Sequence, residues 1–203
     1  ITPEFIDDLT RIYGEFRDGE TRRFTVNGQD DECVVSKVFD NLDFGYRQIT
    51  VERPLRLNFQ ASPERIEQLS QITAFQNLAK SKKKDKKQVA AEEKAGSKQQ
   101  EAIIAILATM NPTKLYKERN AFVVDLEAAF DHADMKLAAP LRKAVLTALS
   151  ERDETAEICR DADGNPEADS ELRDYENVPL KEDIREYFER EVRPHVSDAW
   201  INE

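Results

Sequence analysis

Histidine and cysteine are the side chains most often used for acid–base catalysis, nucleophilic attack and metal binding near neutral pH, and the chain has only four of them. His132 stands between two aspartates at the end of a predicted helix, where a cation interacts favourably with the helix dipole. His195 follows a proline and has no nucleophile nearby. Cys33 and Cys159 are too few for a disulfide framework or a four-thiolate zinc site, and they fit a reducing compartment. The pattern favours neither a catalytic nor a metal site, and leaves open a hydrolase or transferase in which the fold brings a histidine to a cysteine or to carboxylates.

Oxygen-bearing side chains alternate along one acidic segment, as they do in a calcium-binding loop. The alternating residues are Asp161, Asp163, Asn165, Glu167 and Asp169. A calcium loop needs its glycine at the sixth position, after three ligands, and a glutamate at the twelfth, whereas Gly164 directly follows the second aspartate of this run. We therefore interpret the segment as a solvated acidic hairpin with a turn at residues 163–166. A weak calcium site is the alternative.

Loops that bind nucleotides or phosphates need closely spaced glycines. The six glycines of this chain are never two residues apart, which excludes a dinucleotide-binding loop, and there is no P-loop. Asn111-Pro112-Thr113 has one proline too few, and no aromatic residue, to match the Asn-Pro-Pro-aromatic signature of amino-methylating enzymes. A turn that ends a helix is the simpler interpretation, so the sequence predicts no catalytic and no cofactor-binding residue.

The net charge of −11 is distributed unevenly along the chain. Residues 1–150 are neutral, with 23 basic and 23 acidic side chains, whereas residues 151–203 carry 7 basic and 18 acidic ones. This balance argues against a protein that coats nucleic acid or anionic membrane with its whole surface.

One short segment is strongly basic, because residues 80–87 contain six lysines. Residues 80–100 have almost no apolar side chains, so we interpret them as a flexible linker that cannot bury enough surface to offset its ordering entropy. The alternative is contact with the DNA backbone, which would make binding strongly salt-dependent. The candidate DNA-contacting residues are Lys82, Lys83, Lys84, Lys86 and Lys87. Without interleaved aromatic or arginine side chains, base reading is not expected.

A length of 203 residues suffices for one domain or two small ones with a real core. The longest uncharged apolar run, residues 102–110, is nine residues long, whereas a membrane-spanning helix needs about 20. Because there is also no signal-peptide pattern, we expect a cytoplasmic protein. The chain starts with Ile1 in place of Met, so we expect it to be part of a longer protein.

Amphipathic helices dominate the predicted fold. Thr2 and Pro3 suit an N-cap and a first helical turn, apolar residues then recur at helical spacing up to Phe16, and Gly19 ends the run. Further helices are predicted from residue 62, over residues 99–110, from residue 120, from residue 139 and over residues 180–192.

Residues 33–39 and 46–57 are rich in β-branched and aromatic side chains and flank a turn composition at residues 40–45, which predicts a β-hairpin. The predicted fold class is therefore mainly α (α+β), with amphipathic helices and one or two small β-hairpins. Four parts are expected: residues 1–60 (helix plus hairpin), 61–79 (helix), 80–100 (the lysine-rich linker) and 101–203 (a C-terminal helical module with the acidic hairpin and the last helix).

Two segments of the chain resemble a known family. The first comprises residues 34–39, 44–47 and 51–57, the last of which read Val-Glu-Arg-Pro-Leu-Arg-Leu. The second begins as Leu-Arg-Asp-Tyr-Glu-Asn-Val-Pro-Leu-Lys-Glu-Asp-Ile at residues 172–184 and continues through residues 187–188, 192–196 and 198–200. Together they are similar to the C-terminal part of the modification (methyltransferase) subunit of type I restriction–modification systems. The match covers about 60 of the 203 residues.

The resemblance implies a function for the chain as part of a larger enzyme. Members of this family are adenine-N6 DNA methyltransferases that use S-adenosylmethionine, and their cofactor loop and Asn-Pro-Pro-Phe/Tyr motif lie upstream of the segment matched here. The chain alone is therefore expected to be inactive and to hold no cofactor, with S-adenosylmethionine expected for the whole subunit. The family's C-terminal helices pack on the DNA-reading specificity subunit. This implies a docking and assembly module, with residues 33–57 at or near the end of the methyltransferase domain.

Two groups of apolar residues are candidates for the partner interface. Leu180, Ile184, Tyr187 and Phe188 lie at helical spacing and could pack either in the chain's own core or against a partner helix. Val196, Trp200 and Ile201 lie in a tail that nothing in the sequence anchors, and tryptophan is enriched at interface hot spots. A piece of a larger protein leaves apolar surface uncovered, so we also expect the isolated chain to self-associate.

Overall fold

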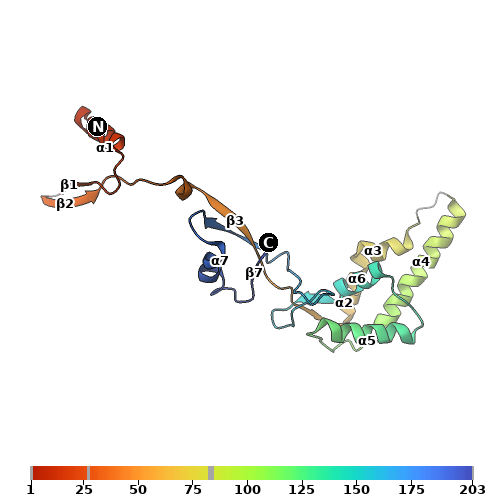
Figure 1. Cartoon of the computed structure of the whole chain (residues 1–203). Helices are drawn as coiled ribbons and strands as arrows, with labels where there is room; N and C mark the ends of the chain where they lie inside the picture. The colour runs from red at the N-terminus through yellow and green to blue at the C-terminus, as the bar shows by residue number, and fades with distance from the viewer. Residues whose placement is uncertain (1, 27, 82–84, 203) are drawn as a thin grey trace. The chain divides into compact units, whose positions relative to one another are not determined.

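The computed structural model describes residues 2–26, 28–81 and 85–202, and it divides into two compact units (Figure 1). Unit 1 is formed by Ile1–Val51 and Asp174–Glu203, and unit 2 by Glu52–Arg173. Helices combine with small antiparallel hairpins and sheets, which confirms the predicted α+β class. The predicted C-terminal module of residues 101–203 is wrong, because residues 174–202 belong to unit 1, where residues 174–179 pair with residues 46–51.

Unit 1 begins with the predicted helix, α1 (Pro3–Glu15), which has Thr2 at its N-cap and ends at Phe16 in the left-handed region (φ 48°). A hairpin of β1 (Thr21–Val26) and β2 (Gln29–Val34) follows, with Thr21 opposite Val34. Gly28 has φ +78° in the turn, a conformation that glycine adopts without strain.

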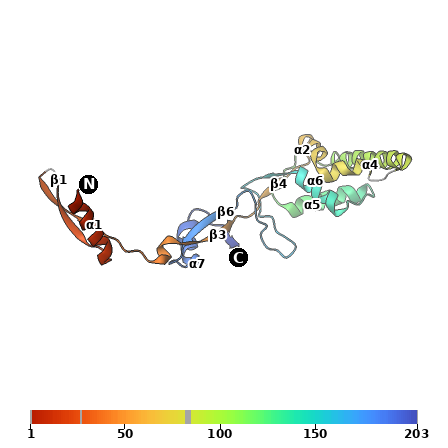
Figure 2. The ribbon, with the colours of Figure 1, turned by 90° about the horizontal axis from the view of Figure 1, so that it is seen from above.

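The hairpin predicted from residues 33–39 and 46–57 is wrong. Its first part belongs largely to β2 and to the extended segment after it, and the predicted turn contains a short 3₁₀ helix, η1 (Asn41–Phe44). Its second part is β3 (Tyr46–Glu52), which pairs antiparallel with β6 (Asp174–Pro179). Figure 2 shows β3 and β6 side by side.

A small core holds the second half of unit 1 together. The strand order is β6-β3-β7, where β7 is Trp200–Asn202. The predicted last helix begins later than expected, as α7 (Ile184–Tyr187) with Asp183 as its N-cap, and continues as a π-helical turn, η4 (Phe188–Val192). The buried residues of this core are Ile49, Val51, Val178, Phe188, Val192 and Ala199.

Unit 2 is a helical cluster on a short strand pair. Its elements are α2 (Pro63–Gln68), η2 (Leu69–Gln71), α3 (Thr73–Gln76), η3 (Asn77–Ala79), α4 (Lys86–Leu107), α5 (Arg119–His132) and α6 (Ala139–Ala148), with β4 (Leu57–Phe59) antiparallel to β5 (Ser150–Arg152). Phe59 stacks on Phe122 with ring centroids 5.2 Å apart, and both are almost completely buried. The helix starts predicted near residues 62, 120 and 139 are confirmed.

The linker predicted over residues 80–100 is wrong for most of its length. Residues 86–100 belong to α4, a continuous helix of 22 residues whose N-cap, Asp85, accepts hydrogen bonds from the backbone amides of Lys87 and Gln88. The cause is compositional: Ala, Lys, Gln and Glu lower hydrophobicity, but they are also strong helix formers. Packing at Gly96 against η3 then holds this half of the helix in place.

The acidic segment forms the predicted turn. A carboxylate oxygen of Asp161 accepts hydrogen bonds from the backbone amides of Asp163 and Asn165, at 2.9 Å each. Residues 160 and 166 form an antiparallel bridge, and Gly164 has φ +86° at the tip. This carboxylate therefore stabilises a loop, and the residues that the structure describes contain no cluster of three or more His, Cys, Asp or Glu side chains suited to a metal ion.

Candidate protein-interaction surface

The histidine and cysteine side chains, which are best suited to catalysis, are not assembled into a catalytic site. His132 and His195 are both exposed, as is Cys33. Cys159 is buried beside the Arg119 guanidinium, and burial raises the pKa of its thiol, which disfavours the nucleophilic thiolate. This arrangement argues against the hydrolase or transferase that the sequence left open.

The candidate partner residues near the C-terminus lie mainly in the core of unit 1. Phe188 is buried, and Ile184, Tyr187, Val196 and Ile201 pack against the same core. Leu180 and Trp200 are half-buried. Of the two alternatives for these residues, the structure therefore favours the intrachain core.

The candidate DNA-contacting lysines are only partly within the described residues. Lys86 and Lys87 are exposed in the first turn of α4, while Lys82, Lys83 and Lys84 lie outside the residues that the structure describes. Lysines at a helix N-terminus add to the positive end of the helix dipole, so this end of α4 is locally cationic.

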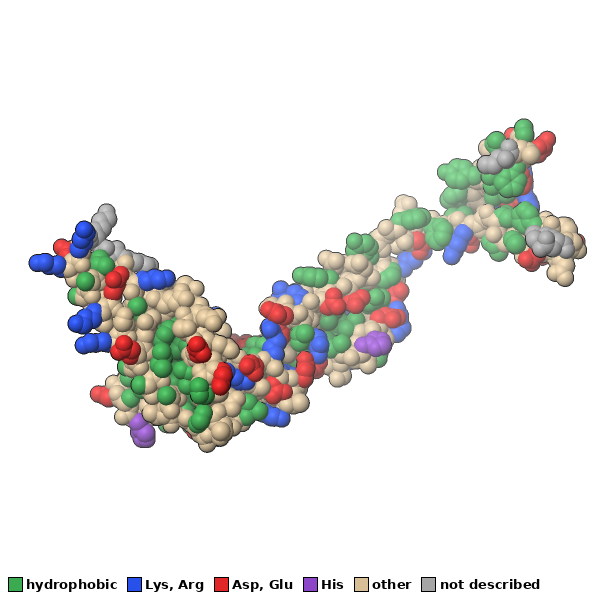
Figure 3. Space-filling view, turned by 180° about the vertical axis from the view of Figure 1, so that it is seen from behind, with side chains coloured by type: hydrophobic (Ala, Val, Ile, Leu, Met, Phe, Trp, Pro, Cys, Tyr) green, Lys and Arg blue, Asp and Glu red, His purple; other side chains and the backbone are tan. Residues whose placement is uncertain are grey.

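The apolar face of α1 is exposed. Ile12 is buried, but the other apolar side chains of this face keep about half or more of their surface accessible: Phe5 52%, Ile6 53%, Leu9 52%, Tyr13 84% and Phe16 73%. Figure 3 shows hydrophobic side chains gathered at this N-terminal end of unit 1. The helical spacing in the sequence reveals this stripe, but not whether the stripe is covered.

A groove of about 320 Å³ lies between α1 and the extended segment of residues 35–38. Its lining consists of Leu9, Ile12, Tyr13, Phe16, Arg17, Val35, Ser36, Lys37 and Val38. Hydrogen bonds hold the segment in place: the Val35 amide donates to the Glu20 carbonyl (2.8 Å), and the Val38 amide donates to the Asp18 carboxylate (2.8 Å). The two charged side chains in this lining are both cations.

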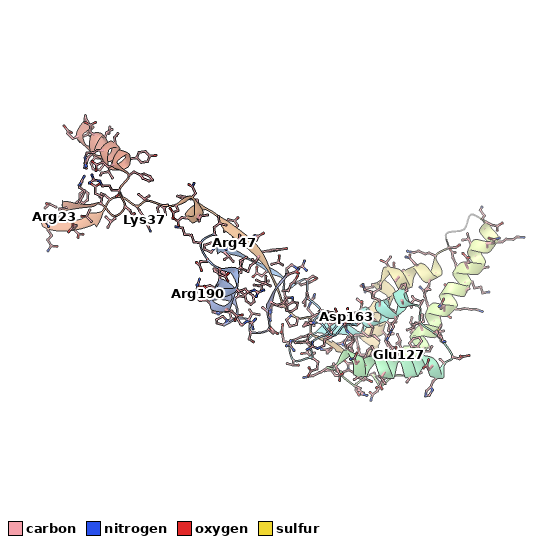
Figure 4. All side chains as sticks on the ribbon, viewed as in Figure 1. Arg23, Lys37, Arg47, Glu127, Asp163 and Arg190 are labelled. Carbon is pink, nitrogen blue, oxygen red and sulfur yellow. The ribbon has the colours of Figure 1, made fainter. Side chains whose placement is uncertain are left out.

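A second exposed apolar cluster, which we call the aromatic turn, surrounds η1. Its members are Phe39, Leu42, Phe44 and Tyr46, which are 47%, 51%, 75% and 61% exposed. The Phe39 and Phe44 rings meet edge to face at 5.7 Å, and the Lys37 ammonium, labelled by residue in Figure 4, lies 4.9 Å from the centre of the Phe39 ring.

Charged groups hold the aromatic turn together through hydrogen bonds and ion pairs. Asp40 and Asp43 form a reciprocal cap, in which each backbone amide donates to the other residue. The Lys181 ammonium bridges both carboxylates, at 2.8 Å and 2.7 Å, and its hydrogen bond holds the pKa of Asp43 below its usual range. Exposed aromatic rings are thus displayed on a turn that hydrogen bonds and ion pairs hold together.

Comparisons with models of known families, with curated proteins and with solved structures found no match. Among the described residues, no helix is long and apolar enough to cross a membrane. Unit 1 carries two exposed apolar surfaces, the α1 face and the aromatic turn.

Proposed function

We propose that this chain is a non-catalytic assembly module of a type I adenine-N6 DNA methyltransferase subunit, which docks onto the specificity subunit in a DNA modification and restriction complex. The observation that supports this most strongly is the exposed apolar face of α1. Large contiguous apolar patches are rare on monomeric proteins and mark surfaces that a partner covers. The resemblance of residues 34–57 and 172–200 to the family supplies the identity of the complex.

The chemistry of the chain fits a docking role better than a catalytic one. S-adenosylmethionine would supply the methyl group in the whole subunit, but this sequence has neither the cofactor loop nor the Asn-Pro-Pro-aromatic motif. Docking would instead remove water from the α1 face and from the aromatic turn. Burial of apolar surface stabilises a complex by about 25 cal/mol per Å². Aromatic rings bury a large area and lose little conformational entropy on binding.

The proposal is tested by capture of the specificity subunit's conserved helices with the whole chain. We expect Phe44→Ser and Leu9→Ser each to weaken capture about tenfold, since hot-spot truncations commonly cost more than about 1 kcal/mol. Val124→Ser is the matched control: Val124 is 64% exposed on α5 of unit 2, so its replacement should leave capture of the helices unchanged. Failure of the unmodified chain to bind the helices would refute the proposal.

A second candidate function is binding of the DNA backbone through the lysines of residues 80–87. The locally cationic start of α4, with Lys86 and Lys87 exposed in its first turn, supports it. This function predicts duplex binding by the chain alone. Each phosphate neutralised by a lysine would add about 0.9 to the slope of log affinity against log salt.

A further inference from the structure

We infer that the groove between α1 and residues 35–38 receives an amphipathic helix of a partner protein whose apolar stripe is flanked by acidic residues. This inference rests on the proposed function, because it takes the chain to be a docking module, and it narrows that function to one surface and one kind of occupant.

The shape of the apolar surface favours a helix. Phe5, Leu9 and Tyr13 follow one another at a spacing of four residues along α1, and at 1.5 Å per residue they span about 12 Å, or just over two helical turns, with Phe16 at the C-cap beyond them. A second helix can lie along such a stripe with its side chains in the spaces between these residues. Val35 and Val38, half-buried on the opposite side of the groove, would contact the apolar face of that helix.

An extended peptide fits less well, because strand addition needs a backbone edge with open hydrogen-bonding groups. The amides of Val35 and Val38 already donate to Glu20 and Asp18, and the Ser36 carbonyl already accepts from the Gly19 amide at 3.1 Å. The groove therefore offers side-chain contacts more than a strand edge.

The charges of the groove favour acidic flanks on the occupant. Arg17 has a 71% exposed side chain and makes a loose ionic contact with Glu15, at 3.7 Å. The Lys37 ammonium lies over the Phe39 ring and is exposed.

The carboxylates around α1 make their shorter ion pairs with other cations, and the contact of Glu15 with Arg17 is longer, at 3.7 Å. Asp8 and Glu15 pair with Arg11 at 2.7 Å and 2.9 Å, and Glu20 pairs with Arg22 at 2.7 Å. A partner helix with carboxylates beside its apolar stripe would thus complement both the shape and the charge of the groove.

The test uses the whole chain and two synthetic helical peptides of about 18 residues, or five turns. Both peptides carry the same leucine stripe, and they differ only in having glutamate or lysine on its flanks. At low salt we expect the glutamate peptide to bind about tenfold tighter, since two exposed ion pairs each contribute up to about fivefold. Arg17→Glu together with Lys37→Glu should abolish this preference. Arg23→Glu, an exposed cation on β1 that does not line the groove, should leave it intact.

Four results would overturn the inference. Equal binding of the two peptides would remove the charge argument, and binding that Leu9→Asp does not weaken would place the peptide elsewhere. A chain that is dimeric, becomes monomeric with Leu9→Asp and binds neither peptide would show that a second copy covers the groove. If the chain still captures the specificity subunit's helices when Arg17 and Lys37 are both glutamate, the inference fails while the proposed function stands.

Discussion

Replacement of Gly96 by alanine should destabilise unit 2, although alanine is the better helix former. Gly96 lies in the middle of α4, where η3 crosses it. A Cβ atom built on Gly96 would lie 1.7 Å from the Leu78 carbonyl oxygen, 2.5 Å from the Leu78 carbonyl carbon and 3.0 Å from the Ala79 Cα. All three atoms are backbone, so no side-chain rotation relieves the clash.

The magnitude follows from two opposing effects. An ordinary contact of about 3.4 Å would require α4 and η3 to separate by about 1.7 Å, and a gap of even 0.5–1 Å forfeits about a quarter to a half of the dispersion energy between the surfaces. Overpacking of this kind costs about 3 kcal/mol when the backbone itself must move. The gain in helix propensity returns about 1 kcal/mol. The expected net loss in the free energy of unfolding is therefore about 2 kcal/mol.

Urea denaturation followed by far-ultraviolet circular dichroism measures this loss. Ala95→Gly is the control for helix propensity in the same helix, because Ala95 is exposed, and it should cost about 1 kcal/mol. Gly14→Ala, with no atom within 4 Å of its added methyl group, should stabilise α1 slightly. An unchanged or raised midpoint for Gly96→Ala would refute the close crossing of α4 and η3.

Three further changes test the packing and the electrostatics. Arg65→Lys should cost unit 2 about 2–3 kcal/mol in urea denaturation, because the buried guanidinium donates to the Leu149 carbonyl (3.1 Å) and to the Asn58 side chain (2.8 Å), and a lysine cannot reach both. An unchanged urea midpoint for Arg65→Lys would show that this network does not stabilise unit 2. Phe188→Ala should cost unit 1 about 3–5 kcal/mol, measured by fluorescence of its tryptophan, and a loss below about 1 kcal/mol would mean that Phe188 is not a core residue. Hydrogen bonds from Thr155 and, to a lesser extent, Asn58 lower the pKa of Asp153 to about 2. The ionised carboxylate therefore stabilises the fold fully above about pH 4, and this stabilisation is lost as the pH falls towards 2. Asp153→Asn should make stability less dependent on pH in this window, and an unchanged pH dependence would contradict the lowered pKa.

Local signals in the sequence were sufficient for most helices but not for strand pairing. Thr2-Pro3, Ser62-Pro63 and the proline at residue 140 mark helix starts that the structure confirms. The partner of β3 lies more than 120 residues away in β6, and no local pattern specifies that pairing. The dipeptide at residues 27–28 is Asn-Gly, which is a strong hairpin signal, so the β1–β2 hairpin could have been predicted from the sequence.

The candidate site could be predicted only in part. Helical spacing identified the apolar stripe of α1, but exposure depends on which tertiary neighbours are present, and a single helix cannot report them. For residues 86–100 the same composition is typical of both a solvated linker and a helix, and the contact at Gly96 that supports the helix comes from η3, outside that segment. The aromatic turn depends on Lys181, which is distant in sequence from Asp40 and Asp43.

We propose that this chain binds a protein partner through unit 1 and does not bind DNA by itself. The most direct measurement is a salt titration of two reactions of the whole chain, one with duplex DNA and one with the specificity subunit's conserved helices. We predict no duplex binding even at low salt, together with capture of the helices. Duplex binding by the chain alone, with a steep salt slope that Lys86→Gln and Lys87→Gln flatten, would show instead that the chain contacts the DNA backbone itself.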